Sequence, residues 1–293
     1  MAISSKGVSS SNVIYLAIHD SPRTLLLPKK LGIKKIQAPI KTNFYKSLNI
    51  RVVKRLLNFY KTIDRKSTLI VEYDGNLVIV LALIITNIVH RKTFKVFLDC
   101  HVNSYVDTNL KSFKSFLKLS IILVLRTIFK FRIIVHNTES KKLIKKSIYC
   151  PSPFPKLNNC IKHKVSNKKK IFIISSLNKD EPINEFIDAA KTLSLNGIDV
   201  SISGNFNKLS NDYVDKGGDF FTGFLSKDEY IEKINDSSLV IAMTKRSYNL
   251  LFAPREALLY RRKCLINNSK ENKNFYGSLC FYSDIDAKSI SDN

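Results

Sequence analysis

The sequence lacks most of the short motifs that identify common classes of enzyme and binding protein. It contains no Cys-x-x-Cys pair, no zinc-finger spacing, no His-Glu-x-x-His, no nucleophile elbow and no Walker loop. Gly217, Gly218 and Gly223 lie close together but do not form a Gly-x-Gly-x-x-Gly fingerprint. These absences argue against a zinc protein, a serine hydrolase and a P-loop nucleotidase.

The chain also lacks the features of a secreted or membrane-spanning protein. Its five cysteines form no even framework, which is typical of unpaired thiols in a reducing cytosol. The N-terminal segment MAISSKGVSSSN has no apolar core of the kind found in signal peptides. We therefore expect a cytoplasmic protein.

Long hydrophobic runs are scarce. Residues 77–89 are apolar but number about 13, against the roughly 20 that a membrane-spanning helix needs. The run 117–135 is interrupted by Arg126, Lys130 and Arg132. Both runs are better interpreted as buried helices and strands, although the second could alternatively rest on an anionic membrane surface.

Acidic residues are few compared with basic ones. The chain has 48 Lys and Arg against 24 Asp and Glu, a formal net charge of +24. Such a balance favours anionic partners: nucleic acid, acidic lipid or nucleotide substrates. Because the cations are scattered and no RNA-binding aromatic motif appears, no nucleic-acid partner is expected. A basic nucleic-acid-binding α/β protein remains an alternative that rests on charge alone.

The first half alternates between strands and helices. This alternation predicts a parallel, doubly wound sheet. Asn137 or Thr138 can cap the last helix of the half by accepting N–H groups at its start. We expect strands at residues 13–18, 69–72, 95–99 and 132–135. Helices are expected over 77–89, 110–127 and 140–146, with a further one that has leucines 25–27 near its start.

A proline-rich segment divides the chain. Residues 150–155 read CPSPFP, and three prolines cannot occupy a helix interior or a central strand. With the basic tract that follows, residues 151–170 are predicted to link an N-terminal domain, 1–150, to a C-terminal domain, 171–293. The predicted fold class is α/β with two Rossmann-like domains. In the second domain we expect strands at 171–174, 200–203 and 238–243, and helices at 182–195, at 228–237 and from Pro254.

The segment after the strand at 238–243 is built like an anion site. The loop TKRSYN follows the carboxyl end of that strand, where open α/β sheets bind ligands. Pro254 suits the first turn of the next helix because its missing N–H costs nothing there. Lys245, Arg246 and Arg255 place cations near this helix start, and helix N-termini bind phosphates.

The segment from Gly223 to Ile266 resembles the donor-binding half of GT-B glycosyltransferases, in particular glycosyltransferase family 4 and its group 1-like members. Their signature is a helix reading roughly Glu-Ala-Leu-x-x-Gly-Lys-Pro, and this chain has EALLYRRK from Glu256. GFLSKDEY resembles the family's phrase before the preceding helix. The chain departs from the family in two places: Tyr248 stands where many members have a first glutamate, and RRK at 261–263 replaces Gly-Lys-Pro.

The resemblance extends over nearly the whole chain. DCHVN at 99–103 is similar to the family's Asp-x-His motif at a strand end. Four other segments also resemble family segments: EYDGN at 72–76, HNT at 136–138, SPFP at 152–155 and SSLNKDEP at 175–182. This implies GT-B architecture, with two domains facing a central cleft. The donor domain of this chain ends earlier than is usual, so a truncated, minimal or degenerate member is expected.

The resemblance also implies roles for individual residues. Cations would stabilise the leaving diphosphate without a metal, and Glu256 would hydrogen-bond the ribose. His101 would act as base or acceptor ligand, beside Asp99. The implied donor-binding set is Glu256, Arg246, Arg255, Lys245, Lys179 and Thr244; the catalytic pair is His101 and Asp99; and the acceptor-side residues are His19 and Arg23.

These features predict a metal- and cofactor-independent glycosyltransferase at the inner face of a membrane. It would move a hexose from a nucleotide sugar to a lipid-linked or cell-surface polysaccharide or glycolipid acceptor. The positive charge would hold it peripherally on anionic lipid. The alternative is a catalytically degenerate GT-B subunit that scaffolds a partner transferase, favoured by Tyr248, by the lost Gly-Lys-Pro and by the early C-terminus.

Overall fold

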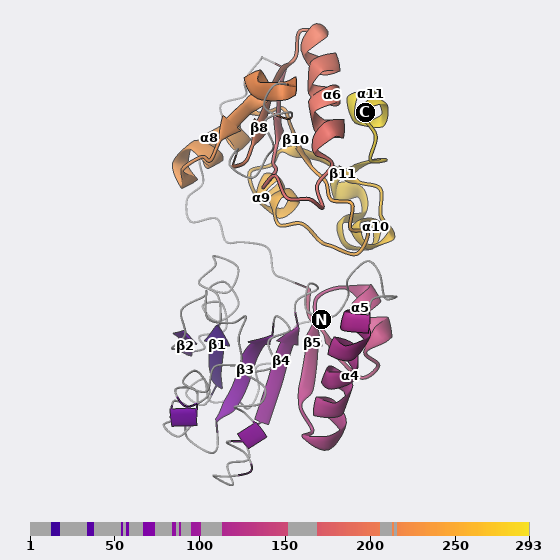
Figure 1. The fold of residues 1–293 in the computed structure, drawn as a ribbon. Coiled ribbons are helices and arrows are strands. Elements are labelled where there is room, and N and C mark those ends of the chain that lie inside the picture. Colours follow the sequence, from indigo (N-terminus) through magenta and orange to yellow (C-terminus); the bar gives the residue numbers. More distant parts are fainter. Residues whose placement is uncertain are drawn as a thin grey trace. The chain divides into compact units, whose positions relative to one another are not determined.

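The computed structural model describes residues 13–17, 34–37, 67–73, 95–100, 113–151, 169–205 and 216–292, with a few isolated helical residues between them. The chain divides into two compact units, Met1–Pro153 and Phe154–Asn293. Each is built on a six-stranded sheet, and all described strand pairs are parallel (Figure 1). The predicted α/β class with two Rossmann-like units is confirmed. The division falls within the predicted linker, of which residues 152–168 lie outside the described part.

The N-terminal sheet has the strand order β2-β1-β3-β4-β5-β6. Its inner strands are apolar enough to be buried, and Leu69, Val71 and Leu98 are fully buried. The order reverses between β1 and β3, so their carboxyl ends form the switch point at which such sheets bind ligands. The strands are β1 Val13–Ala17, β2 Lys34–Gln37, β3 Thr68–Tyr73, β4 Lys95–Cys100, β5 Arg132–Val135 and β6 Ile148–Tyr149.

Two helices of this unit are described along most of their length, α4 Phe113–Ile128 and α5 Thr138–Leu143. Asn137 caps α5, because its side-chain oxygen accepts a hydrogen bond from the Ser140 N–H at 2.7 Å. The helix predicted over 140–146 therefore starts and ends earlier. The left-handed φ of Lys146, +65°, turns the chain into β6, which the sequence pattern does not reveal.

The C-terminal sheet has the order β12-β11-β10-β7-β8-β9. Read from β9 to β12 and numbered along the chain from β7, the order is third, second, first, fourth, fifth, sixth, which is the strand order of the dinucleotide-binding Rossmann fold. The order reverses between β7 and β10, which are neighbours in the sheet. The strands are β7 Lys170–Ile173, β8 Asp199–Ser203, β9 Phe221–Gly223, β10 Leu239–Ala242, β11 Lys263–Asn267 and β12 Phe281–Ser283.

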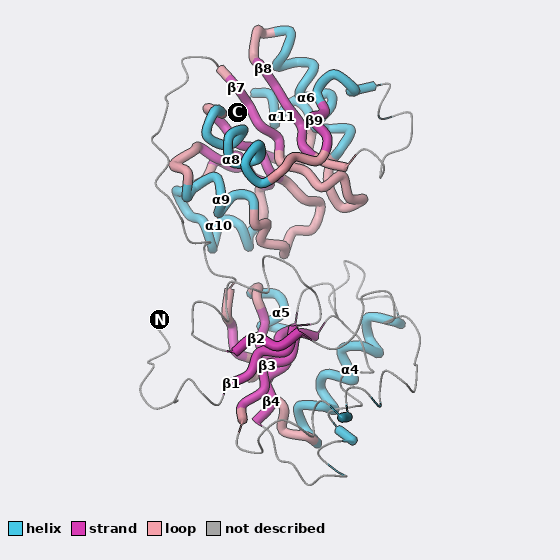
Figure 2. Tube along the Cα trace, turned by 90° about the vertical axis from the view of Figure 1, so that its left-hand side faces the viewer, coloured by secondary structure: helices cyan, strands magenta, loops and turns pink. Residues whose placement is uncertain are grey.

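Helices cover both faces of this sheet (Figures 1 and 2). Alternate residues of β7 enter opposite cores: Ile173 packs with α6 and α11, whereas Phe172 packs with α8, α9 and α10. A strand buried on both faces requires a continuous apolar run, which is what the sequence shows. The helices are α6 Ile183–Leu195, α8 Lys227–Asp236, α9 Ala253–Leu259, α10 Lys270–Tyr276 and α11 Ala287–Asp292, with short 3₁₀ turns at Gly218–Phe220 and Gly277–Leu279.

The helix α9 ends in a left-handed turn at a residue that is not glycine. Arg261 has φ +54°, its N–H donates to the Leu258 carbonyl, and the Arg262 N–H donates to the Ala257 carbonyl. This pair of bonds is a Schellman motif, in which the left-handed position is most often glycine. Arg261 is the position at which the resembled family has glycine, so the substitution costs backbone strain without changing the fold.

Replacing Arg261 with glycine should therefore stabilise the C-terminal unit. Glycine has no Cβ atom, so it avoids the cost of about 1–2 kcal/mol that the left-handed conformation imposes on other residues. Part of this gain is offset because glycine loses more conformational entropy on folding. We therefore expect the free energy of unfolding to rise by about 0.5–1 kcal/mol. Urea unfolding measures the change. Arg261→Ala, which keeps the Cβ atom, is the control and should give no gain; equal stabilisation by both variants would contradict the interpretation.

Candidate functional site

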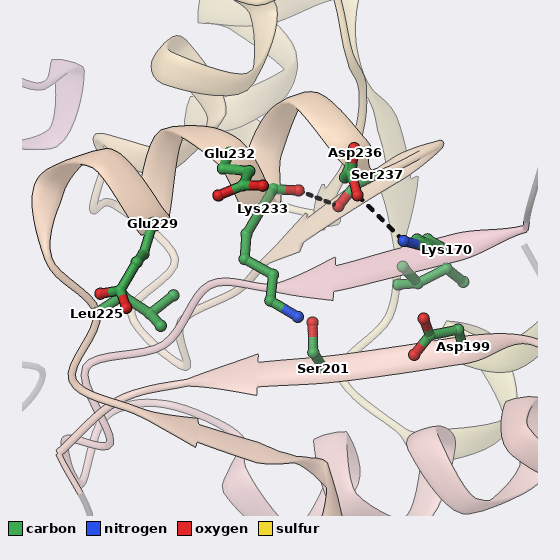
Figure 3. A pocket seen from close by; sticks show the side chains of 10 residues that line it. Lys170, Asp199, Ser201, Leu225, Glu229, Glu232, Lys233, Asp236 and Ser237 are labelled. Atoms are coloured by element: carbon green, nitrogen blue, oxygen red, sulfur yellow. Dashed lines mark hydrogen bonds and ion pairs between the residues drawn. The ribbon is translucent and has the colours of Figure 1, made fainter. Parts of the chain in front are cut away.

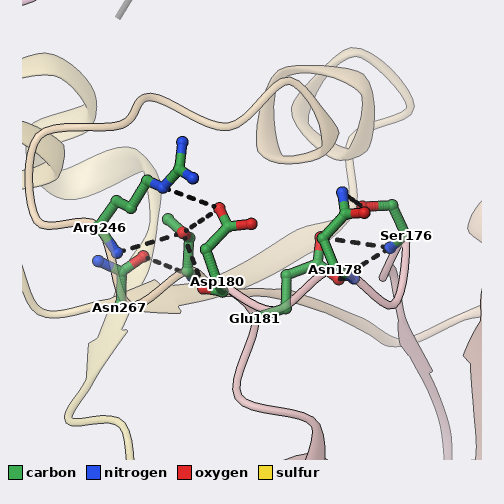
Figure 4. Close-up of polar contacts among 7 residues, drawn as sticks. Ser176, Asn178, Asp180, Glu181, Arg246 and Asn267 are labelled. Atoms are coloured by element: carbon green, nitrogen blue, oxygen red, sulfur yellow. Dashed lines mark hydrogen bonds and ion pairs between the residues drawn. The ribbon is translucent and has the colours of Figure 1, made fainter. Parts of the chain in front are cut away.

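The loops that follow β7 and β10 meet at the switch point of the C-terminal sheet. Asp180, after β7, joins them through its main chain: its carbonyl oxygen accepts from the Lys245 N–H at 2.7 Å and from the Thr244 hydroxyl at 3.1 Å. Its carboxylate lies 3.4 Å from Nε of Arg246 (Figure 4). The structure thus brings together Thr244, Lys245 and Arg246 of the predicted donor-binding set and fixes them against the loop after β7.

Thr244 is the centre of this junction. Its side chain is fully buried, and its hydroxyl oxygen accepts from the Arg246 N–H at 3.2 Å while its own proton goes to Asp180. A hydroxyl can act as donor and acceptor at once, so one side chain orders both loops. Thr244 therefore fixes the conformation of the loop after β10 from a buried position. On the same loop, Lys245 is exposed and Arg246 is partly exposed.

A carboxylate of the chain itself fills the loop after β7. Glu181 accepts hydrogen bonds from the Ser176 N–H at 2.9 Å, the Ser176 hydroxyl at 2.8 Å and the Asn178 N–H at 3.3 Å (Figure 4). It also accepts from the Ser175 hydroxyl at 2.5 Å. Leu177 between them has a left-handed φ of +54°. Successive N–H groups around such a residue form an anion-binding nest, and here Glu181 occupies it.

Carboxylates balance the cations at this edge of the sheet. Nζ of Lys245 lies 3.4 Å from Oε1 of Glu185, and Arg246 faces Asp180 at the same distance. These pairs are long and partly exposed, and such pairs contribute little stability. The cations can therefore exchange their carboxylate partners for another anion at small cost. Lys179, predicted to join them, is exposed on the same loop as Asp180.

Glu256 lies in the first turn of α9, the helix that follows this cation loop. Its Oε2 accepts a hydrogen bond from the hydroxyl of Tyr230 on α8, at 2.6 Å. Burial, and then the charge of Glu256, raise the pKa of the Tyr230 phenol, and the same two causes raise the pKa of Tyr260. Both phenols consequently stay protonated and available as donors beside the carboxylate.

Arg255 is buried, unlike Lys245 and Arg246. Its side chain is 1% exposed, and its guanidinium lies over the ring of Phe275 on α10, 4.9 Å from the centroid. Successive residues of a helix point about 100° apart, so Arg255 faces α10 while Glu256 faces α8. Arg255 therefore contributes to the packing of α9 on α10, and its predicted role in donor binding stays a prediction. Tyr248, at the position of the family's first glutamate, is also buried.

In the N-terminal unit, Asp99 lies at the carboxyl end of β4 and is 2% exposed. Its Oδ1 lies 2.5 Å from Nε2 of His136, which follows β5, and Nδ1 of His136 lies 2.6 Å from the Cys150 carbonyl oxygen. Since a carbonyl oxygen only accepts, Nδ1 carries a proton, and Nε2 and the carboxylate share another. The sequence pattern predicted that His136 follows a strand, but it did not predict the contact with Asp99.

The charge of Asp99 also acts on neighbouring thiols. Burial, and then Asp99, raise the pKa of both Cys100 and Cys150, so each stays a neutral thiol. The described cysteines are all free, as predicted. His101, His19 and Arg23, which the sequence assigns to catalysis and to the acceptor side, lie outside the described residues.

The Asp99–His136 pair should be energetically coupled. Replacing His136 with phenylalanine leaves the buried carboxylate without its imidazole partner and should lower the free energy of unfolding by about 3 kcal/mol. The double variant with Asp99→Asn should lose less than the sum of the single variants. Denaturant unfolding of the four proteins gives the coupling energy, and strictly additive losses would contradict a direct bond.

A groove of about 310 Å³ runs beneath α8 (Figure 3). Its floor is polar because Asp199 and Ser201 of β8 alternate with buried apolar residues. Lys170 pairs there with Asp236 at 3.1 Å, which raises the pKa of Lys170 through the hydrogen bond and the charge. Lys170 and Asp199 are the first residues of their strands, so this end of the groove lies at the amino edge of the sheet, opposite the switch point.

Among the described residues, no three His, Cys, Asp or Glu side chains cluster closely enough to hold a metal ion. None of the described helices is both long and apolar enough to cross a membrane.

This chain matches known proteins by structure and not by sequence. No protein-family model and no curated protein sequence matches it. Among solved structures, Anabaena HepE in complex with UDP and glucose matches with a TM-score of 0.65 at 12% identity, over 96% of this chain and 88% of HepE. A glycosyltransferase from Rickettsia africae matches with a TM-score of 0.62 at 12% identity, over 95% and 78%. S. aureus TarM matches with 0.63 at 17% identity, over 82% of this chain and 51% of TarM.

Proposed function

We propose that this chain, whose fold is that of the GT-B glycosyltransferases, transfers a hexose from a nucleotide sugar to a saccharide or lipid-linked acceptor. The observation that carries the proposal is the switch point between β7 and β10. There the chain presents Lys245 and Arg246 on one loop and Glu256 on the helix that follows it. Cations for phosphates and a carboxylate for hydroxyls are the two groups that a nucleotide diphosphate requires.

In this proposal Lys245 and Arg246, with Lys179, bind the diphosphate of the donor. Transfer of the sugar leaves a nucleoside diphosphate that gains negative charge, and positioned cations stabilise that charge in the transition state. Arg246 can form two parallel hydrogen bonds to phosphate oxygens, whereas Lys245 acts as a point charge. Their long contacts with Asp180 and Glu185, both 3.4 Å, would be exchanged for contacts with the donor.

Glu256 binds the ribose hydroxyls. A carboxylate offers about four lone-pair sites, so it can accept from both ribose hydroxyls in addition to Tyr230. HepE has been solved with UDP-glucose and with UDP and glucose, and these likenesses of fold support a uridine nucleotide and a hexose as the first donor to test.

For the acceptor side, the proposal keeps the residues that the sequence indicates. His101 would serve as base or acceptor ligand, with Asp99 beside it, and His19 and Arg23 would lie nearer the acceptor. The acceptor would be a lipid-linked or cell-surface polysaccharide precursor. The net charge of +24 supports peripheral binding to an anionic membrane at the cytoplasmic face.

Donor binding can be tested by thermal shift with UDP, GDP, UDP-glucose, GDP-mannose and AMP. A ligand at a hundred times its Kd adds about 2.7 kcal/mol, which corresponds to a rise of roughly 5–10 °C in Tm for a unit of this size. We expect one nucleotide diphosphate to raise Tm, and both Glu256→Gln and Arg246→Gln to reduce the rise by weakening the binding of the nucleotide. Glu232→Gln, an exposed glutamate on α8, is the matched control and should leave it unchanged.

Transfer should not depend on a metal ion. If cationic side chains stabilise the leaving diphosphate, a radiolabelled sugar-transfer assay should retain most of its rate in excess EDTA. The Arg246→Gln variant should lose at least about tenfold in rate under the same conditions. Loss of the wild-type rate in EDTA, recovered by Mg²⁺ or Mn²⁺, would contradict this part of the proposal.

A second candidate, a non-enzymatic GT-B subunit that scaffolds a partner transferase, is favoured by one observation. The nest after β7 already holds Glu181, and Asp180 and Glu185 face the neighbouring cations. A chain that needs no phosphate would be expected to neutralise the site in this way. For a scaffold, no nucleotide raises the Tm of the folded wild type, and loss of Glu256 leaves partner binding intact.

A further inference from the structure

We propose that Tyr230 is a positioning residue for the donor: its hydroxyl fixes the carboxylate of Glu256 in the orientation that accepts the ribose hydroxyls. This inference rests on the proposed function and extends it to a residue on a different helix, α8. Tyr230 itself contacts no substrate in this account, because it acts through Glu256.

The contact joins three elements of the C-terminal unit. The Tyr230 hydroxyl donates to Oε2 of Glu256 at 2.6 Å, a short hydrogen bond to a charged acceptor. The Tyr230 ring packs edge-to-face on Phe172 of β7, with the centroids 6.0 Å apart, and Phe172 is fully buried. The phenol is therefore held between the floor of the sheet and the carboxylate on α9.

The start of α8 is fixed by its own sequence, which places Tyr230. Ser226 caps the helix by accepting from the Glu229 N–H at 3.3 Å, and the Glu229 carboxylate accepts from the Ser226 N–H at 2.7 Å. This reciprocal pair is a capping box, which sets the first residue of the helix. Ile234, one turn after Tyr230, is fully buried and anchors the same face of the helix.

The geometry favours a positioning role over a purely structural one. A hydrophobic residue would fill the space above Phe172 equally well, so packing alone does not require the hydroxyl. The hydroxyl instead restricts the side-chain torsions of Glu256, whose carboxylate keeps acceptor capacity for further donors. Because burial and the charge of Glu256 keep the phenol protonated, the restraint holds throughout the working pH range.

A carboxylate fixed for ribose hydroxyls should distinguish ribose from 2′-deoxyribose. That preference provides a readout that a structural defect would not change selectively. The probes are UDP and 2′-deoxy-UDP, and their affinities are measured by isothermal titration with the wild type, Tyr230→Phe and Tyr282→Phe. Tyr282 is the matched control, because its hydroxyl donates to the carbonyl of Gly277 at 2.6 Å and not to a carboxylate.

We expect Tyr230→Phe to weaken UDP about three- to tenfold, the effect of losing one hydrogen bond, and to weaken 2′-deoxy-UDP less, because that nucleotide offers Glu256 only its 3′-hydroxyl. Its preference for ribose should fall accordingly, while Tyr282→Phe keeps both affinities. In a Glu256→Gln background, Tyr230→Phe should have little further effect, because the two residues act as one unit.

Three results would overturn the inference. Unchanged UDP affinity in Tyr230→Phe, or an equal loss for UDP and 2′-deoxy-UDP, would show that the hydroxyl does not orient Glu256 for the ribose. Additive losses in the double variant would show that the two residues act separately. Each of these leaves the proposed function standing, whereas a folded wild type that binds neither UDP nor GDP contradicts the proposed function itself.

Discussion

The parallel pairing of β7 with β10 is the constraint on which the candidate site depends. These strands are fourth and third in the order of the C-terminal sheet, and the chain leaves them in opposite directions along the sheet. Their carboxyl-terminal loops therefore meet without another strand between them. The main-chain carbonyl of Asp180 joins the two loops by accepting from the Lys245 N–H and the Thr244 hydroxyl, and that hydroxyl in turn accepts from the Arg246 N–H.

Electrostatics at this junction is balanced rather than strongly positive, despite the charge of the whole chain. Three cations on the loops, Lys179, Lys245 and Arg246, lie near three carboxylates: Asp180 and Glu181 on the loop after β7, and Glu185 in the first turn of α6. The pairs involving Lys245 and Arg246 are long and partly exposed, so a diphosphate can replace their partners. Glu181 is held by four hydrogen-bond donors, and displacing it would cost more. If a diphosphate binds by replacing only the weakly held partners of Lys245 and Arg246, the donor site is active. If it must also displace Glu181, the site stays neutralised by the chain's own carboxylates.

The sequence predicted the fold well where apolar runs were continuous, as at β5, β7 and β10, because a strand buried on both faces has few alternatives. It missed β2, β6, β9, β11 and β12, none of which is longer than five residues; β11 is the one among them with four consecutive buried residues. At the site, Thr244, Lys245 and Arg246 were predicted together because strand ends gather ligands. The burial of Arg255 and the bond from Tyr230 to Glu256 depend on the rotation of α9 and on helices distant in the sequence, which no local pattern reveals.

The central claim is that a nucleotide diphosphate binds between the loops after β7 and β10. The most direct measurement is a titration of the ¹⁵N-labelled protein with UDP, followed by amide chemical shifts. Shifts concentrated at residues 175–181, 244–246 and 256 would agree with the claim. A folded protein that shows no shifts, or shifts confined to the groove beneath α8, would contradict it.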